Sequence, residues 1–345
     1  GMTAPTEARG RGGRAVARAA AVAARERRGR QFDSGAMNPL VSDADIIDST
    51  PGVSLELRKT FRLSDAPFIG DFALGNSQLS YAYPNLKGLV LLPIPVAAEV
   101  MAEVASMIVP NRDLFAIEEL VNRRMVSFEN GELTLFMRAE RVASGNPELA
   151  AVKVQLRDDK PDSAYTWPIM EATFVMAKKL EPMPVRSMPH TRPRSVHWSG
   201  RDIYPSRICY GRRLRGISFV ETWSESGLDY EVEVPPLAGN VVFTRFPIWL
   251  VNPLLLEAVV SAFALWRNRD RFSFAFRMRR LELHAPLPNE GARVKCYLRL
   301  TGVTPKSHLC DITVSDGKGG VLMTIAGWEE IVKYIRPEYR ELIMQ

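Results

Sequence analysis

The sequence predicts an α+β fold of two similar halves, in each of which an antiparallel sheet wraps around one long buried helix. Two apolar stretches, residues 91–110 and 252–266, predict the two helices. Long strand-like runs surround each stretch, with little sequence between them. Strands so close together leave no room for the crossover helices of a parallel sheet. A sheet with one buried face also needs a covering element, which the apolar helix supplies.

An internal repeat supports the division into two halves. The dipeptide Phe-Ala at residues 115–116 recurs at residues 274–275, and Gly131 recurs as Gly291 at nearly the same spacing. In both halves one apolar helix precedes a set of long strands, so each half is one unit of the repeat. A sheet wrapped around a central helix is the hotdog fold, and its duplication in one chain predicts a double hotdog.

The expected elements divide the chain into three parts. Residues 1–50 form a basic leader and lead-in, residues 51–185 the N-terminal hotdog and residues 186–345 the C-terminal hotdog. Period-two patterns predict strands in the first hotdog at residues 54–63, 114–121, 131–142, 150–156 and 169–179. The same pattern predicts strands in the second hotdog at residues 217–221, 230–234, 272–283, 292–303, 310–316 and 321–331. A proline-rich linker at residues 180–193 joins the halves.

Composition narrows the class of protein. The chain has 345 residues, enough for one large or two ordinary globular domains. It has no apolar run of about 18 residues, which predicts that it does not span a membrane. Cys209, Cys296 and Cys310 show no metal-ligand spacing and are odd in number, which is typical of reduced thiols in a cytoplasmic protein without a bound metal.

The charge pattern does not predict a nucleic-acid partner. The net charge of +6 is scattered along the chain. Residues 3–35, rich in Ala, Arg and Gly, have no apolar core of a secretory signal. A basic arm that binds nucleic acid or a membrane is one interpretation of this leader. A solvated extension is the interpretation that we favour.

The C-terminal helical stretch contains the main candidate site. Pro253 stands where a first helical turn tolerates proline, and apolar residues then continue almost all round the helix, which predicts burial. Glu257 and Ser261 are four residues apart and share one face. A buried carboxylate with a hydroxyl one turn later is either a hydrogen-bonded core pair or half of a reaction site. Periodicity alone favours the core pair, because buried polar pairs are usually structural.

From about residue 55 to residue 340 the chain resembles the dehydratase domains of polyketide synthases and polyunsaturated fatty acid synthases, which are double hotdogs. The resemblance puts Glu257 on the catalytic Asp of the family and Ser261 on the Gln that follows it. In the first half it puts Asp71 and Phe72 on the Asp-His pair of the family. The resemblance further implies substrate-binding positions at Tyr83, Gly88, Pro93, Tyr210 and Gly211.

The chemistry that the resemblance implies is loss of water from a 3-hydroxyacyl thioester. The acyl chain is carried on the phosphopantetheine arm of an acyl carrier protein, and no other cofactor is implied. The His of the family takes a proton from the α carbon, and the Asp gives a proton to the leaving hydroxyl. A backbone N–H at the helix start polarises the thioester carbonyl. The weakly acidic α proton requires the base and the polarised carbonyl to act together.

This chain departs from the family at the base. Phe72 has no titratable group, and a second alignment, counted back from Gly88, puts Pro84 at the same position. Glu257 is one methylene longer than Asp, and misplacement of about an ångström costs on the order of 10²-fold in rate. The histidines of the chain are predicted to be ordinary core or surface residues: His190, His197, His284 and His308.

The sequence therefore favours a catalytically degenerate dehydratase-like protein. We expect it to bind an acyl thioester or an acyl carrier protein, or to serve in a synthase assembly. The alternative is an active dehydratase or isomerase with Glu257 as acid and base. Several arginines are expected near the mouth of the site, where they would attract an acidic carrier protein. The alternative is that they form only a solvated basic face. They are Arg207, Arg212, Arg213, Arg215, Arg267, Arg269 and Arg271. The sequence is compatible with a homodimer and does not decide the oligomeric state.

Overall fold

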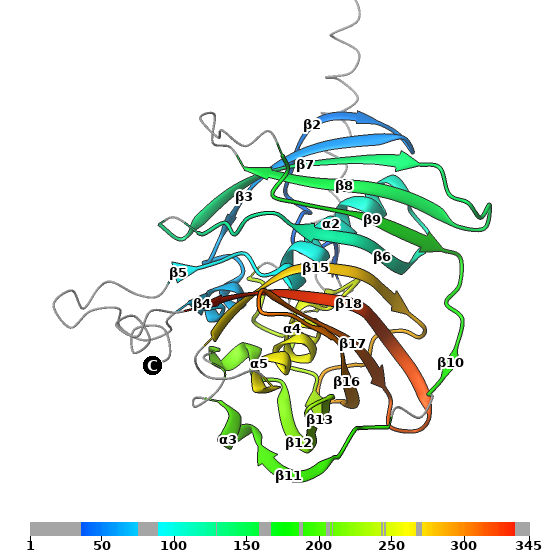
Figure 1. Cartoon of the computed structure of the whole chain (residues 1–345). Helices are drawn as coiled ribbons and strands as arrows, with labels where there is room; N and C mark the ends of the chain where they lie inside the picture. The colour runs from blue at the N-terminus through cyan, green and yellow to red at the C-terminus, as the bar shows by residue number, and fades with distance from the viewer. Residues whose placement is uncertain are drawn as a thin grey trace, which may run out of the picture.

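The structure is a computed structural model of the chain. It describes residues 36–74, 89–128, 130–158, 167–185, 189–204, 210–242, 246–266 and 271–334, together with residues 208 and 244. Its main feature is one 14-stranded sheet that joins both halves of the repeat (Figure 1). The path along the sheet is β11-β12-β13-β16-β17-β18-β15-β6-β9-β8-β7-β3-β2, with β10 added beside β18.

The N-terminal half curves around helix α2 (Ile94–Ile108). Its strands, in spatial order from the sheet edge, are β2 (Asp45–Thr50), β3 (Ser54–Arg62), β7 (Glu132–Val142), β8 (Ala150–Asp158), β9 (Met170–Ala177) and β6 (Asp113–Asn122). All of these pairings are antiparallel. Helix α2 is buried almost all round, because the sheet covers one side and the other half of the molecule covers the other.

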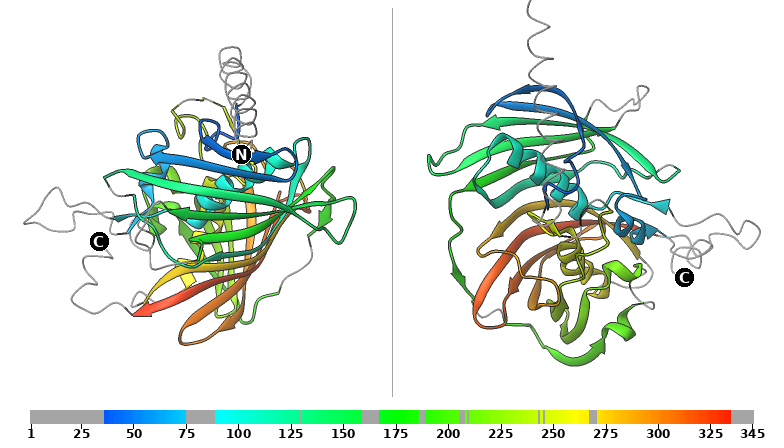
Figure 2. Two further views of the ribbon diagram at one scale, coloured as in Figure 1. Left: turned by 90° about the horizontal axis from the view of Figure 1, so that it is seen from above. Right: turned by 180° about the vertical axis from the view of Figure 1, so that it is seen from behind.

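The C-terminal half repeats this arrangement around helix α4 (Pro253–Ser261) and the short α5 (Phe263–Trp266). Its strands are β15 (Arg271–Leu283), β18 (Gly320–Tyr334), β17 (Ser307–Ser315), β16 (Arg293–Val303), β13 (Gly227–Glu233), β12 (Ile217–Ser224) and β11 (Arg194–Ser199). Strands β15 and β6 pair antiparallel and join the halves. Helices α2 and α4 contact each other on the inner side of the sheet (Figure 2).

The remaining described elements are short. They are β1 (Ala36–Met37), β4 (Ala73–Leu74), β5 (Leu89–Val90), β10 (Met183–Pro184), β14 (Pro247–Ile248), α3 (Gly200–Ile203) and the 3-10 helices η1 (Pro67–Asp71) and η2 (Arg212–Leu214). The pair β1–β14 is parallel and lies apart from the main sheet. No helix in the described part of the chain is long and apolar enough to cross a membrane.

The predicted double hotdog is confirmed, including the equivalence of its repeats. Gly131 and Gly291 occupy the turns that lead into β7 and β16, with φ angles of 81° and 75°. These left-handed angles favour glycine, because a Cβ would crowd the backbone there. The predicted strands of both halves appear close to their expected positions. Cys296 and Cys310 are buried free thiols.

The structure corrects one sequence expectation and adds short strands to two other predicted segments. The C-terminal helix predicted at residues 252–266 is broken at Ala262, whose N–H bonds to the Val260 carbonyl in place of a carbonyl four residues back. The lead-in assigned to residues 1–50 includes the edge strand β2, and Leu40 and Val41 are core residues. The linker at residues 180–193 contributes β10 to the sheet. Such short pieces lack the long periodic pattern that sequence reading relies on.

Candidate functional site

Glu257 lies in the buried helix α4, about one turn after the helix begins at Pro253. Asn252 caps the helix in a left-handed conformation, and its side-chain oxygen accepts the Leu255 N–H at 3.1 Å. Pro253 follows as the first helical residue, where its missing N–H costs nothing. The buried apolar faces of α4 then hold Glu257 inside the half, with only 4% of its surface exposed.

The Glu257 carboxylate meets a phenol. The Tyr210 hydroxyl donates to Glu257 Oε1 at 2.7 Å. The pKa of Glu257 is raised to about 7. Burial raises this pKa, the hydrogen bond from Tyr210 lowers it, and the charge of Glu330 raises it. Burial is the largest of these effects, because a charge is costly in a medium of low dielectric constant. Glu257 can therefore hold or release a proton near neutral pH.

Tyr210 in turn packs against Phe72. The centres of the two rings are 5.3 Å apart with a 49° angle between their planes. Arg215 fixes the backbone of Tyr210, since its Nε donates to the Tyr210 carbonyl at 2.9 Å. The structure thus brings together Phe72, Tyr210 and Glu257, three of the residues that the family resemblance singled out from distant parts of the sequence. The Glu257 carboxylate does not point to bulk solvent.

Asp71 locks the loop of Phe72 to the loop of Tyr210. The Gly211 N–H donates to the Asp71 backbone carbonyl at 2.9 Å, and the Arg213 N–H donates to Asp71 Oδ2 at 2.7 Å. The Arg213 guanidinium adds an ion pair to Asp71 Oδ1 at 3.2 Å. Glycine is required at position 211, because a Cβ there would overlap the Asp71 side chain, whose Oδ1 would lie at 2.7 Å. Asp71 therefore has a positioning role in this structure.

Gly211→Ala is expected to break this lock and to lower the free energy of unfolding by about 1–3 kcal/mol. The new methyl group would lie 2.5 Å from the Asp71 Cβ, so residue 71 has to shift as a whole and loses its bond to the Arg213 N–H. Urea unfolding measures the loss. The double variant Asp71→Gly/Gly211→Ala is the control, because only glycine at position 71 removes the Cβ at 2.5 Å together with the carboxylate. If the two changes were additive, the clash would not be the cause.

Other expected site residues are placed differently. The Ser261 hydroxyl donates to the Ala258 carbonyl of its own helix at 3.0 Å, so the expected core hydrogen bond between Glu257 and Ser261 is not formed: Glu257 bonds to Tyr210 instead. The competing bond of Ser261 coincides with the end of α4 and is typical of serines that disturb a helix. Pro93 caps the start of α2. Tyr83 and Gly88 lie outside the described residues.

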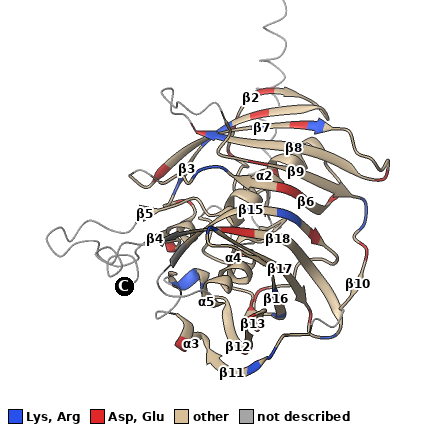
Figure 3. Cartoon of the chain, in the orientation of Figure 1, with Lys and Arg blue, Asp and Glu red and all other residues tan. Residues whose placement is uncertain are grey.

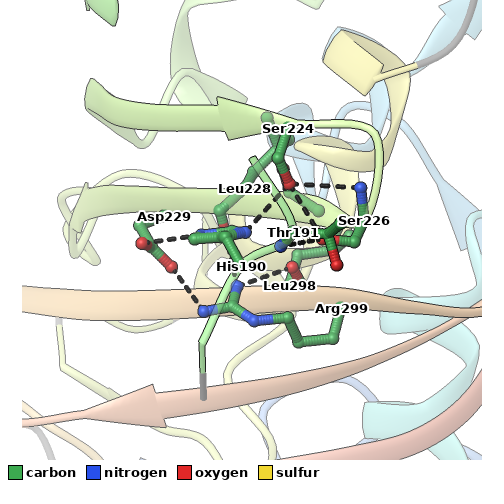
Figure 4. Close-up of polar contacts among 9 residues, drawn as sticks. His190, Thr191, Ser224, Ser226, Leu228, Asp229, Leu298 and Arg299 are labelled. Atoms are coloured by element: carbon green, nitrogen blue, oxygen red, sulfur yellow. Dashed lines mark hydrogen bonds and ion pairs between the residues drawn. The ribbon is translucent and has the colours of Figure 1, made fainter. Parts of the chain in front are cut away.

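His190 is part of a buried polar network in the C-terminal half (Figure 4). Its Nδ1 is 3.0 Å from the Ser224 hydroxyl, and its Nε2 lies 2.7 Å from Asp229 Oδ2. This Ser-His-Asp arrangement was not foreseen from the sequence. Ser224 is fully buried and also bonds to the Ser226 N–H at 3.1 Å and the Gly227 carbonyl at 3.3 Å. A nucleophile needs access to its substrate, so we assign the network a structural role.

The network holds the segment after β10 against the sheet. Arg299 donates to Asp229 Oδ1 at 2.9 Å and to the Leu228 and Leu298 carbonyls (Figure 4). The other histidines pack elsewhere. His197 stacks on Phe219, and His284 contacts Thr324. The His308 ring packs against the rings of α5.

Basic residues are interspersed with acidic ones over the described elements (Figure 3). Of the arginines expected near the mouth, Arg213 and Arg215 have structural contacts, to Asp71 and to Tyr210. Arg212 is exposed on η2. Arg207, Arg267 and Arg269 lie outside the described residues. Among the described residues, no group of three or more His, Cys, Asp and Glu side chains is placed to hold a metal ion.

Sequence reasoning missed three buried or half-buried carboxylates. Glu330 lies on β18 between the buried Trp328 and Val332 and accepts hydrogen bonds from the Trp328 indole at 3.1 Å and from Ser273. Glu99 and Glu103 lie fully buried on α2. A signal for the α2 pair was present, since they are the only charged residues in the helix Ile94–Ile108 and stand four apart. Helical spacing puts them on one face.

Comparisons with known proteins found matches among solved structures only. No protein-family model and no curated protein matches the chain. The dehydratase domain from the CurF module of curacin polyketide synthase aligns with a TM-score of 0.64 and 13% identity, over 87% of this chain and 100% of its own. An inactive histidine-to-phenylalanine mutant of the CurJ dehydratase, in complex with a compound, aligns with a TM-score of 0.62 and 13% identity, over 88% and 99%.

The dehydratase domain of RzxB from Pseudomonas fluorescens aligns with a TM-score of 0.56 and 14% identity, over 83% of this chain and 96% of its own. The alignments span nearly the whole of each neighbour, so the likeness concerns both halves and their junction. The chain has the double-hotdog fold of polyketide synthase dehydratase domains.

Proposed function

We propose that this protein is a catalytically degenerate relative of polyketide synthase dehydratases that binds an acyl thioester, presented by an acyl carrier protein, without dehydrating it efficiently. One observation carries the proposal. The carboxylate of Glu257, which the resemblance puts on the acid of the family, is buried and bonds to Tyr210, and the residue beside that phenol is Phe72. Fold likeness supports acyl chemistry as the class and does not by itself assign an activity.

Glu257 has the properties of a general acid. A group that protonates a leaving hydroxyl must carry its proton at the working pH, and a pKa of about 7 allows Glu257 to do so. The Tyr210 hydroxyl orients the carboxyl group. These two groups would also bind the 3-hydroxyl of an acyl chain by hydrogen bonds, which is why we infer ligand binding at this place.

The base half is the part that we propose to be lost. Abstraction of the α proton needs a positioned base, and the phenyl ring of Phe72 cannot accept a proton. The CurJ dehydratase carrying a histidine-to-phenylalanine change is described as inactive, which supports the same outcome here. Water in an apolar site does not replace a positioned imidazole.

The second candidate function is an active enzyme that uses Glu257 for both proton transfers. The pKa of about 7 favours this candidate, because a group that titrates near the working pH serves as acid and as base. Such a single carboxyl group suits an isomerase, which moves a proton between two carbons on one face of the substrate. Turnover that depends on Glu257 distinguishes this candidate from the first.

We expect the wild-type protein to show little or no turnover of a 3-hydroxyacyl-pantetheine, measured by mass spectrometry. Loss of general-base help typically costs 10²–10⁴-fold in rate. Phe72→His combined with Glu257→Asp restores the family pair and is expected to gain activity. Phe72→His alone and Glu257→Asp alone are the matched controls. Robust wild-type turnover that is lost in Glu257→Gln would contradict the degenerate function and support the single-carboxyl enzyme.

Binding is tested separately with a non-hydrolysable 3-hydroxyacyl-pantetheine amide and calorimetry. The wild type is expected to bind it, and the double variant Tyr210→Phe/Glu257→Leu is expected to bind at least tenfold more weakly, because about 1.4 kcal/mol of hydrogen bonding is lost. Absence of measurable binding by the folded wild type would contradict the proposed function and favour a structural role in an assembly.

A further inference from the structure

Two fully buried carboxylates on α2 occupy a junction between the two halves of the protein. Glu99 and Glu103 have no exposed surface, and they share one face of an otherwise apolar helix. Buried carboxylates are rare unless they are paired or hydrogen-bonded, because desolvation of a charge is costly. Each of them bonds to the backbone of a different segment that crosses α2, so the pair ties those segments together.

Glu99 holds the segment that leads into α4. Its Oε1 accepts the Leu250 N–H at 2.8 Å, and its Oε2 accepts the Val251 N–H at 2.6 Å. The next residue, Asn252, is the left-handed cap of α4. The position at which α4 begins, and hence the position of Glu257, is therefore fixed by a side chain from the opposite half.

Glu103 holds the first described segment of the chain. Its Oε2 accepts the N–H groups of Leu40 and Val41, each at 2.9 Å, and its Oε1 lies 3.1 Å from the Leu40 nitrogen. Ser106, on the next turn, donates to Asn38 Oδ1 at 3.1 Å. Strand β1 of the same segment pairs with β14, which ends at Ile248, two residues before Leu250. The two clamped segments thus lie side by side.

Only one of the two carboxyl groups can be charged without a large penalty. Like charges one helical turn apart, away from water, repel each other strongly. The charged group that acts on Glu103 from the surrounding sheet is Lys59 of β3, and it is ion-paired with Asp43. The pair is therefore expected to keep a proton.

The hydrogen bonds show which carboxyl group keeps the proton. Glu99 uses both oxygens as acceptors for separate N–H groups, an arrangement that favours the charged carboxylate. At Glu103 the two shorter bonds converge on Oε2, so Oε1 is the oxygen that can carry a hydrogen. Burial raises the pKa of Glu99 to about 7, against its backbone hydrogen bonds. Burial and the charge of Glu99 raise the pKa of Glu103 well above its ordinary value.

We propose that Glu99 and Glu103 are positioning residues with unequal roles: Glu99 is the anion that anchors the start of α4, and Glu103 is a neutral carboxyl group that ties the segment Asn38–Val41 to the same helix. The proposal concerns the placement of Glu257 and does not depend on the proposed function. It also couples the N-terminal segment to the site helix, since loss of either anchor loosens a segment that its neighbour packs against.

The test compares Glu99→Gln with Glu103→Gln, both made in the Glu257→Gln background so that Glu257 does not titrate. Glutamine keeps the size of the side chain but has one acceptor oxygen and an NH₂ group. At position 103 it reproduces the neutral carboxyl group, so unfolding free energy and backbone exchange are expected to change little. At position 99 its NH₂ group faces an N–H donor, so a lower urea midpoint than that of Glu103→Gln is expected at about pH 8.

Hydrogen–deuterium exchange and urea unfolding give the two readouts. For Glu99→Gln we expect faster exchange, by at least tenfold, in peptides that cover residues 247–256. We also expect a smaller step in unfolding free energy between about pH 4.5 and the Glu99 pKa of about 7, because only Glu103 still contributes to it. Glu103→Gln should retain the contribution of Glu99 to that step. Equal losses in the two variants, including failure of both to fold, or an undiminished step in Glu99→Gln, would overturn the proposal; failure of Glu99→Gln alone to fold supports it.

Discussion

The free energy of unfolding is expected to fall by several kcal/mol as the pH is raised from about 5 to about 8, which is opposite to the trend set by carboxylates in salt bridges. Glu257 is expected to cause the largest part of this fall in unfolding free energy that can be given a value. Its pKa rises from 4.5 to about 7 in the folded protein, which corresponds to about 3 kcal/mol. Glu99 and Glu103 act in the same direction, because burial raises the pKa of both.

The sign follows from proton binding. A carboxyl group whose pKa is higher in the folded state holds its proton more tightly there than in the unfolded chain. Its contribution to stability is complete below pH 4.5, falls as the pH passes from 4.5 to about 7, and is lost above that range. Glu171, Asp202 and Asp316 have lowered pKa values and act oppositely, with stability lost only in more acidic solution. Maximum stability is therefore expected near about pH 5.

Urea unfolding followed by circular dichroism at several pH values measures this profile. Glu257→Gln is the matched variant, because glutamine keeps the size and can still accept the Tyr210 hydroxyl. Its profile should be flatter than that of the wild type between pH 4.5 and about 7, and it should be the more stable protein at about pH 8. A wild-type stability that rises over this range would show that Glu257 ionises freely, as it would in contact with solvent.

Gly227→Ala is expected to destabilise the C-terminal half by on the order of 4 kcal/mol or more, enough to prevent folding of a marginally stable domain. Gly227 closes the turn between β12 and β13 with a φ angle of 149°, a conformation that L side chains rarely adopt. A Cβ there would overlap the Leu298 carbonyl oxygen and lie 2.9 Å from its carbon. The clashing atoms belong to the backbone of Leu298 in the paired strand β16. They cannot move aside without breaking the hydrogen bonds between β13 and β16.

Gly239→Ala is the control for this substitution. Gly239 has a φ angle of 78°, and a Cβ there would have open space around it. The Gly239→Ala substitution is expected to lower the free energy of unfolding by only about 1–2 kcal/mol, the penalty for a left-handed backbone conformation. Thermal unfolding and the yield of folded protein compare the two variants. Equal effects would show that the φ angle alone matters and that the close approach of β16 at Gly227 is not a constraint.

The sequence by itself determined the architecture of this protein. Period-two alternation located the long strands, and two apolar stretches located the central helices, because burial on a sheet face or around a helix is written into local spacing. The repeated glycines before β7 and β16 marked equivalent turns, since a left-handed φ angle favours glycine wherever it occurs. The same patterns placed Glu257 inside a buried helix.

Only the tertiary structure decided the partners of the buried polar groups. The Tyr210 hydroxyl reaches Glu257 from 47 residues away, in place of the Ser261 partner that helical spacing suggested. Glu99 meets Val251 across 152 residues. Such contacts depend on how the two halves pack, and the pattern of a single element carries no information about its neighbours across the core. A buried carboxylate takes whichever donor the packing brings to it, because leaving it without a partner is costly.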